Sequence, residues 1–535
     1  MLASADRLFA VRRIELNRSY DIAIAGSGFA GSLLAMIAKR LGYSVVLLER
    51  GKHPRVVIGE SSTPLANLLL EELSRRYDLP AIAPFAKWGS WQSQYPAIGC
   101  GLKRGFTFYR HRFGEQNDPS ASFDTQLLVA ASPHNEISDT HWYRADFDEF
   151  LVKHAQELGV EYFDLTQVEH IEHDATGVEI VGSHNGERFC VRAKFLIDAT
   201  GPRGLLHRTL QLQEENLPNY PKTQALWSHF EGVTSPDNSA LGATPPYPPE
   251  SAAVHHVFDG GWIWVLRFNN GITSAGVAAT DAKAADLRLA EGKAAWNRLL
   301  AAMPALENQF KNAKATQPFR HLPQLSFLSA QIVGDRWALL PSAAGFVDPL
   351  LSTGFPLTLL GIERIARILE AGLDSPRLEP DLHHYAQQTR DELLATAQLI
   401  AALYANMNNF ALFRSLCLLY FASASYSETA RRLGKPSLAT SFLLHDRAGF
   451  GSDMETILAR AMHSPRGADA AQLQQDILKA IEPIDVAGLN KPNPCNWYPV
   501  DADDLLQAHA KVHATTEEIE SLLQQCGFYA TQQAP

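Results

Sequence analysis

Residues 19–50 constrain the fold of this chain more than any other stretch. They contain an apolar strand at Asp21–Ala25, a glycine-rich turn at Gly26–Gly31 that opens a helix, and a second apolar strand at Val45–Leu48 that ends at Glu49. The glycines permit the tight turn, the approach of a pyrophosphate and close packing of helix on strand. The helix N-terminus attracts phosphate, and the terminal acid can accept hydrogen bonds from ribose hydroxyls. The segment therefore predicts a βαβ unit that binds a dinucleotide.

Charge and cysteine usage exclude several other classes of protein. The chain has 535 residues, a net charge of −11 and no run of Lys or Arg, which argues against a nucleic-acid partner. Its five cysteines are scattered without a CxxC pair, so neither a disulfide framework nor a metal site is predicted. The first twenty residues lack the apolar core of a signal peptide, and Arg414 interrupts the most apolar late stretch, Phe410–Tyr426. These features predict a cytoplasmic protein with no membrane segment.

The remaining pattern predicts a mixed α/β fold in three parts. Residues 1–220 and 325–375 combine buried strands with helices and form the predicted Rossmann-type nucleotide-binding domain. Residues 221–324 alternate apolar and polar positions around prolines, which indicates an inserted antiparallel sheet that forms the substrate region. Residues 376–535 form a predicted C-terminal helical cap, with helical periodicity for example from Ala395 to Leu412.

Three motifs far apart in the sequence fit one cofactor. They are the turn Gly26–Gly31, the segment Asp198–Gly201 and the segment Gly345–Pro349. Together they resemble the FAD-binding framework of the hydroxybenzoate-hydroxylase-type flavoproteins. In that framework the second motif approaches the adenine side, and the third approaches the ribityl chain and the flavin ring. The resemblance implies FAD rather than NAD as the cofactor.

The same resemblance implies a set of cofactor contacts. Arg144 stands where the family has an arginine that contacts the cofactor. The family usually has Gly-Asp where this chain has Pro341 and Ser342, so a serine hydroxyl replaces the carboxylate that binds the ribityl hydroxyls. The implied FAD contacts are Gly26, Gly28, Ala30, Gly31, Glu49, Arg50, Ser61, Arg144, Val168, Ala199, Gly201, Asp348, Gly354 and Phe355.

A tryptophan pair narrows the resemblance. Trp262 and Trp264 lie in the segment Gly260–Arg267, which is similar to the Trp-x-Trp-x-Ile-Pro signature of the flavin-dependent halogenases. Leu266 and Arg267 replace the Ile and Pro of that signature. By itself the pair is also consistent with an ordinary aromatic strand, in which both rings share one face.

A lysine supports the same family. Lys103 follows the loop Gly59–Pro64 by some forty residues, as the catalytic lysine of the halogenases does. Taken alone, Lys103 is also consistent with a solvated lysine at a strand end. Together with the tryptophans, it makes the chain resemble the tryptophan-halogenase-like branch of these flavoproteins.

A fourth segment resembles the halide site of these enzymes. Asp348–Gly354 precedes a predicted helix, and the implied halide contacts are Ser352, Thr353 and Gly354. An anion is favoured at such a helix N-terminus. Leu351 replaces a glutamate that tryptophan-type halogenases place near the reactive lysine. This departure favours a phenol, a pyrrole or another electron-rich aromatic substrate, either free or tethered to a carrier.

The resemblance also implies a reaction, of a kind found in secondary metabolism. In the family, reduced FAD and O2 form a C4a-hydroperoxide, which oxidises chloride or bromide to hypohalous acid. Trp262 and Trp264 would wall a tunnel and keep the substrate from the hydroperoxide. Lys103 would relay the halogen, either as a chloramine or as an ammonium hydrogen-bonded to the acid. The sequence has no second nucleotide fingerprint, so a separate NAD(P)H-dependent flavin reductase is the expected partner; a homodimer is left open.

Two alternative functions stay open. The first is an FAD-dependent monooxygenase or dehydrogenase on the same scaffold, in which Lys103 is structural and the altered tryptophan motif marks lost halogenation. The second, a minor one, is a non-catalytic FAD-binding protein. The residues at 266, 267 and 351, which depart from the family pattern, are the features that keep both open.

Overall fold

The predicted mixed α/β fold is confirmed by the computed structural model, which describes residues 18–115, 119–235 and 243–529. The signal-peptide prediction falls on residues 1–17, which lie outside the described residues. The same is true of two parts of the predicted domains, residues 236–242 and 530–535. The expected βαβ unit consists of β1 (Arg18–Ala25), α1 (Phe29–Arg40) and β2 (Val45–Leu48). In the described part of the chain, no helix is both long and apolar enough to cross a bilayer.

A mostly parallel sheet brings the distant motifs together. Its strand order is β19-β20-β10-β1-β2-β7, and an antiparallel extension, β8 and β9, attaches to β10. Ala25, at the end of β1, pairs with Leu48 of β2 and with Asp198 of β10. Because parallel strands end at the same sheet edge, the glycine turn, Glu49 and the Asp198 segment meet there. The further strands are β7 (Glu161–Phe163), β8 (Thr166–Asp174), β9 (Gly177–His184), β10 (Glu187–Asp198), β19 (Val333–Gly334) and β20 (Trp337–Leu339).

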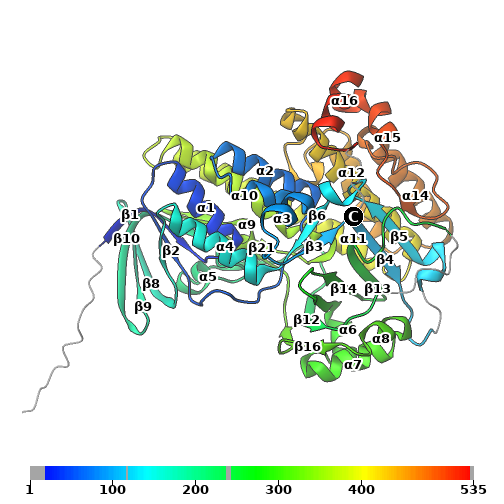
Figure 1. Cartoon of the computed structure of the whole chain (residues 1–535), viewed down its shortest axis with the longest axis horizontal. Coiled ribbons are helices and arrows are strands. Elements are labelled where there is room, and N and C mark those ends of the chain that lie inside the picture. The colour runs from blue at the N-terminus through cyan, green and yellow to red at the C-terminus, as the bar shows by residue number, and fades with distance from the viewer. Residues whose placement is uncertain (1–17, 116–118, 236–242, 530–535) are drawn as a thin grey trace, which may run out of the picture.

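Helices α1, α4 (Arg144–Glu157), α10 (Gly354–Ala371) and α2 (Pro64–Arg76) lie together beside this sheet, as Figure 1 shows. The residues of α1 from Phe29 to Ala38 are all buried, since the helix packs between the sheet and its neighbouring helices. The fingerprint helix is therefore part of the core, and its N-terminus is held in place against the sheet edge.

The antiparallel sheet lies in the lower right of Figure 1, with its helices α6, α7 and α8 on its outer side. Its strand order is β16-β12-β15-β14-β13-β4-β5-β22, and β17 also pairs with β12. The pairs β13–β4 and β5–β22 are parallel, and the other pairs are antiparallel. The sheet extends beyond residues 221–324, because β4, β5 and β22 come from other parts of the chain. Its elements are β4 (Gly105–Arg110), β5 (Gln126–Ala130), β12 (Thr223–Glu231), β13 (Ala253–Phe258), β14 (Gly261–Arg267), β15 (Ile272–Thr280), β16 (Lys314–Ala315), β22 (Trp497–Tyr498), α6 (Asp281–Leu287), α7 (Lys293–Ala301) and α8 (Pro304–Phe310).

The C-terminal region is helical, but the periodicity predicted through Ala395–Leu412 is interrupted. Helix α11 (Leu378–Ala405) ends before Asn406, whose side chain donates to the carbonyl oxygens of Ala402 and Ala461. Helix α12 (Phe410–Arg432) then begins with Asn409 as its N-cap. Asparagines compete for backbone hydrogen bonds in this way, so they end one helix and start the next.

The other elements connect these parts. Two short strands, β3 (Cys100–Lys103) and β6 (Asp139–Trp142), form a separate antiparallel pair beside β14. The remaining helices and strands are α3 (Trp88–Gln94), α5 (Leu205–Thr209), β11 (Glu214–Glu215), β17 (Arg320–Leu322), β18 (Phe327–Ser329), α9 (Pro341–Ala344), β21 (Gly345–Phe346), α13 (Phe450–Ala461), α14 (Gly467–Ile481), α15 (Ala502–Gln507) and α16 (Thr516–Gln525).

Candidate active site

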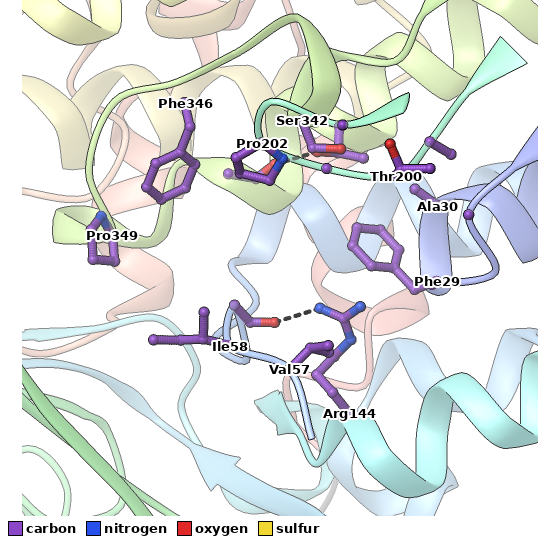
Figure 2. A pocket seen from close by; sticks show the side chains of 18 of the residues that line it. Phe29, Ala30, Val57, Ile58, Arg144, Thr200, Pro202, Ser342, Phe346 and Pro349 are labelled. Atoms are coloured by element: carbon purple, nitrogen blue, oxygen red, sulfur yellow. Dashed lines mark hydrogen bonds between the residues drawn. The ribbon is translucent and has the colours of Figure 1, made fainter. Parts of the chain in front are cut away.

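A cavity of about 810 Å³ lies between the edge of the parallel sheet and the face of the antiparallel sheet. Figure 2 shows side chains from both halves of the chain around this space, among them Phe29, Arg144, Pro202 and Phe346. The cavity runs from the ends of β1 and β2 to the tryptophans of β14. A large, mostly apolar hollow with a few polar groups is what a cofactor site requires.

The three glycines of the turn have three different surroundings. A Cβ atom on Gly26, whose φ is +94°, would lie 2.6 Å from the carbonyl oxygen of Ala199, and one on Gly31 would lie 1.9 Å from that of Gly26. Around Gly28, the nearest atoms to such a Cβ are side-chain ends at 3.4 Å or more. Gly26 and Gly31 therefore make the turn compact, while Gly28 leaves open space at the start of α1, where phosphate groups are favoured.

Glu49 is an ionised group at the edge of the cavity. Its carboxylate accepts hydrogen bonds from the N–H groups of Ser27 (3.1 Å) and Gly51 (2.8 Å) and pairs with Arg55 at 3.2 Å. Burial raises the pKa of Glu49, but the charge of Arg55 and these N–H groups outweigh burial and lower the pKa below its usual value.

Arg144 fastens two segments at the cavity wall. Its guanidinium pairs with Asp148 one turn along α4 at 2.7 and 2.8 Å, and it donates to the carbonyl oxygen of Gly59 at 2.9 Å, the contact drawn in Figure 2. The loop Gly59–Pro64 is thereby held beside the space at Gly28.

The structure brings most of the predicted site residues to this one cavity. Gly31 and Lys103 do not line it: Gly31 packs inside the turn, and Lys103 lies behind the wall. The predicted residues that line the cavity are Gly26, Gly28, Ala30, Glu49, Arg50, Ser61, Arg144, Val168, Ala199, Gly201, Trp262, Trp264, Asp348, Ser352, Thr353, Gly354 and Phe355.

Lys103 is wholly buried, so the alternative of a solvated lysine is wrong. Its Nζ donates to the hydroxyl of Ser61 at 3.0 Å and to the carbonyl oxygen of Ser62, and it lies 3.8 Å from the centre of the Phe106 ring. Because Ser61 lines the cavity, the ammonium is one hydrogen bond away from that space.

A carboxylate faces the lysine across a strand pair. Lys103 of β3 lies directly opposite Asp139 of β6, and side chains at opposed positions share one face of the sheet. Asp139 is buried and accepts from Asn67 at 2.9 Å. Burial lowers the pKa of Lys103 while the charge of Asp139 opposes that change; burial likewise raises the pKa of Asp139.

Replacing Asp139 by Asn should lower the pKa of Lys103 further, because it removes the negative charge that favours the ammonium form. The shift can be measured by NMR titration of lysines labelled with ¹³C at Cε, with the Lys103 signal assigned by its loss in Lys103→Met. Glu428→Gln is the comparison variant: the charge of Glu428 raises the pKa of Asp139, so its removal favours ionised Asp139 and should not lower the pKa of Lys103. An unchanged Lys103 titration in Asp139→Asn would contradict the coupling.

Asp348 connects the tryptophan strand to the helical cap. Its carboxylate accepts from the indole N–H of Trp262 (3.2 Å), the hydroxyls of Tyr404 (2.9 Å) and Tyr220 (3.4 Å), and the N–H of Leu350 (3.0 Å). Burial raises the pKa of Asp348 to about 6, and these donors oppose the rise. The network therefore fixes the indole of Trp262 at the cavity wall.

Tyr404→Phe should destabilise the protein by about 2 kcal/mol, the usual effect of losing a buried hydrogen bond to a charged group. Tyr385→Phe on the same helix is the control. Its hydroxyl donates to the neutral carbonyl oxygen of Leu339 at 2.6 Å, so a loss of about 1 kcal/mol is expected. Urea unfolding compares the two variants, and equal losses would argue against a charged acceptor at Asp348.

The segment before α10 turns sharply. Leu351 and Ser352 both have left-handed backbone conformations, with φ of 64° and 56°. The Leu351 side chain is fully buried and does not line the cavity, whereas Ser352, Thr353 and Gly354 do. The first N–H groups of α10 have no acceptor within the helix, so the cavity ends at a place where an anion is favoured.

The departures from the family pattern have separate structural roles. Arg267 donates to the carbonyl oxygens of Val233 and Thr234 and lies outside the cavity lining. Leu266 and Ser342 line the cavity, so Ser342 is placed to offer a hydroxyl where the family has a carboxylate.

Several residues of the site were not predicted from the sequence, some for lack of any signal and others although a weak signal exists. Asp139 and Tyr404 are found only through the strand pairing and the packing of the cap. Arg55 closely follows Glu49, and Glu60 belongs to the loop that resembles the halogenases, so position along the chain could have suggested both. His229, the hydrogen-bond partner of Glu60, lies on a strand far from that loop.

Comparisons with known proteins agree with this geometry. The profile described as tryptophan halogenase matches residues 129–411. The chain is 30% identical to the monodechloroaminopyrrolnitrin halogenase PrnC of Pseudomonas fluorescens, over 70% of this chain and 66% of that protein. It is also 30% identical to the tetracycline 7-halogenase of Kitasatospora aureofaciens, over 76% of this chain and 74% of that protein. A mutant of halogenase PltM, solved in complex with FAD, is similar with a TM-score of 0.79 and 25% identity, covering 90% of this chain and 99% of that one.

Proposed function

Because the chain belongs to the tryptophan halogenase family, we propose that it is an FAD-dependent halogenase that uses reduced FAD, O2 and a halide to halogenate an electron-rich aromatic compound. The observation that carries the proposal is the position of Lys103. This buried lysine lies one hydrogen bond behind the wall of a dinucleotide-sized cavity, and the two tryptophans line that cavity.

The residues of the cavity fit FAD. The open space at Gly28 and the start of α1 suit the pyrophosphate, and the ionised Glu49 suits the ribose hydroxyls. Arg50 and Val168 would flank the adenosine end, while Ser342, Asp348 and Gly354 would lie along the ribityl chain and the ring. When bound, reduced FAD supplies the electrons with which O2 is converted into an oxidant for the halide.

The chain's own residues would then hold the halide, separate the reactants and deliver the halogen. The first N–H groups of α10, with Ser352 and Thr353, would hold the halide anion. Trp262, fixed by Asp348, would keep the organic substrate away from the flavin. Lys103 would receive the hypohalous acid, and its lowered pKa favours the neutral amine that a nucleophile needs.

The proposed substrate class rests on the residue at position 351. No carboxylate stands at position 351, so the chain lacks a base there, and Leu351 is buried away from the cavity. Phenols and pyrroles are activated by their own ring substituents and react without such a base. One relative acts on 1H-pyrrole-2-carbonyl groups on a peptidyl carrier protein, so both free and carrier-bound aromatics belong in the test. The proposed partner is a separate NAD(P)H-dependent flavin reductase.

The proposal is tested by incubating the purified protein with FAD, a flavin reductase, NADH, O2, bromide and a panel of phenols and pyrroles. We expect mass spectra in which one member of the panel gains bromine. A product that gains only oxygen would indicate a monooxygenase, and one that loses hydrogen would indicate a dehydrogenase. A protein that binds FAD and changes none of the panel would favour the non-catalytic alternative.

A further inference from the structure

One carboxylate of the cavity is left half unpaired. Among the described residues, Glu49, Glu60 and Asp348 are the carboxylates that line the cavity. Both oxygens of Glu49 and both oxygens of Asp348 accept hydrogen bonds. Glu60 differs: its Oε1 is 2.7 Å from Nε2 of His229, while its Oε2 is buried without a hydrogen-bond partner.

His229 shows the same imbalance on its far side. It is 2% exposed, its Nδ1 has no hydrogen-bond partner among the residues that the structure describes, and the rings of Tyr143, Trp227 and Phe268 surround it. An unpaired buried polar atom costs about 1–3 kcal/mol, so native proteins keep few of them. The free oxygen of Glu60 is therefore a buried acceptor that lacks a partner, on a side chain that belongs to the cavity lining.

Glu60 also stands between two groups that the proposed function uses. The carbonyl oxygen of the preceding residue, Gly59, accepts from Arg144, and the hydroxyl of the following residue, Ser61, accepts from Lys103. Glu60 is thus held from both sides in the cavity lining, and the residue that follows it accepts from Lys103.

The overall reaction of the proposed function consumes one proton. Oxidation of the halide X⁻ balances as reduced FAD (FADH2) + O2 + X⁻ + H⁺ → FAD + HOX + H2O. Transfer to the aromatic compound ArH balances as HOX + ArH → ArX + H2O. The first of these two reactions consumes one proton. That proton is needed by the oxygen atom of O2 that does not enter HOX and leaves as water. A positioned acid typically contributes about 10²–10⁴-fold to such a step.

We propose that Glu60 is the acid that supplies this proton through its free Oε2, with His229 as the positioning residue that donates its Nε2 hydrogen to Oε1. The inference rests on the proposed halogenase function. The proposal requires Glu60 in its acid form and His229 as a neutral ring before the transfer, so that neither group carries a charge in these buried, aromatic surroundings. After the transfer, the Nε2 hydrogen stabilises the carboxylate until water in the cavity returns the proton to Oε2.

The test compares wild type with Glu60→Gln, which keeps the shape of the side chain and removes the proton. Each protein is mixed with reduced FAD, O2, bromide and monochlorodimedone, which traps hypobromous acid. Bromination and hydrogen peroxide are both measured per reduced FAD consumed. We expect Glu60→Gln to form about 100-fold less brominated product, with peroxide in its place. Its affinity for FAD, measured by fluorescence quenching, should equal that of wild type.

His111→Gln is the matched control, because His111 and His256 form another buried hydrogen-bonded pair, 2.8 Å apart, that does not line the cavity. His111→Gln should brominate like wild type. If Glu60→Gln loses FAD, His229→Asn carries the test with the same expected loss of bromination. Bromination by Glu60→Gln equal to that of wild type would overturn the inference alone. A wild type that brominates nothing in this assay or in the substrate panel would overturn the proposed function, and the inference with it.

Discussion

Replacing Lys103 by Met is expected to lower formation of the halogenated aromatic product by about 1,000-fold, a loss of the size seen when a reacting side chain is removed. The variant should stay folded, because Met fills a similar volume and a buried ammonium is costly to keep. Oxidation of reduced FAD should continue, since Lys103 does not line the cavity. Product is measured by mass spectrometry with a substrate that wild type halogenates.

A second measurement on the same variant separates formation of the oxidant from its delivery. Lys103→Met should still brominate monochlorodimedone, because hypobromous acid forms before the lysine acts on it. Lys153→Met is the control, as Lys153 is an exposed lysine paired with Glu149. Substrate halogenation by Lys103→Met at the rate of wild type would show that the lysine is only structural.

Gly31→Ala, which adds one methyl group, is expected to destabilise the fold by at least about 3 kcal/mol and to abolish FAD binding. The new Cβ would lie 1.9 Å from the backbone carbonyl oxygen of Gly26, so the turn or α1 must move. Helix α1 lies in the core, because all its residues from Phe29 to Ala38 are buried. Urea unfolding gives the stability, and quenching of FAD fluorescence gives the affinity.

Gly28→Ala provides the contrast within the same turn. The backbone of Gly28 has φ of −66°, which alanine adopts freely, and a Cβ there would meet only flexible side-chain ends at 3.4 Å or more. We expect this variant to unfold at nearly the urea concentration of wild type and yet to bind FAD at least about tenfold more weakly, because the methyl group would occupy the space proposed for the pyrophosphate. Equal FAD binding by Gly28→Ala and wild type would place the cofactor elsewhere.

The glycine turn was predictable because its chemistry is local. Gly26, Gly28, Gly31 and the carboxylate of Glu49 all belong to one short βαβ unit, and parallel pairing then brings Asp198 to the same edge. Their spacing along the chain therefore carries most of the information about where they lie. The same holds for Trp262 and Trp264, which lie two positions apart on one strand, so that both side chains are on one face and line the cavity together.

The environment of Lys103 could not be predicted in this way. Its burial depends on the pairing of β3 with β6 and on the loop that brings Ser61 to its amine. Glu60 and His229 are 169 positions apart, and no local pattern signals that they meet. The interruption at Asn406 was missed for a related reason: apolar periodicity continues through it, while the hydrogen bond to Ala461 that ends the helix is tertiary.

As a halogenase, this protein would use O2 to oxidise a halide and leave no oxygen atom in its product. A single turnover with chemically reduced FAD, ¹⁸O2, bromide and the aromatic substrate tests this most directly, since no reductase is then present. We expect a product that carries the two bromine isotopes and contains no ¹⁸O. A product that contains ¹⁸O and no bromine would contradict it and would identify the protein as a monooxygenase on the same scaffold.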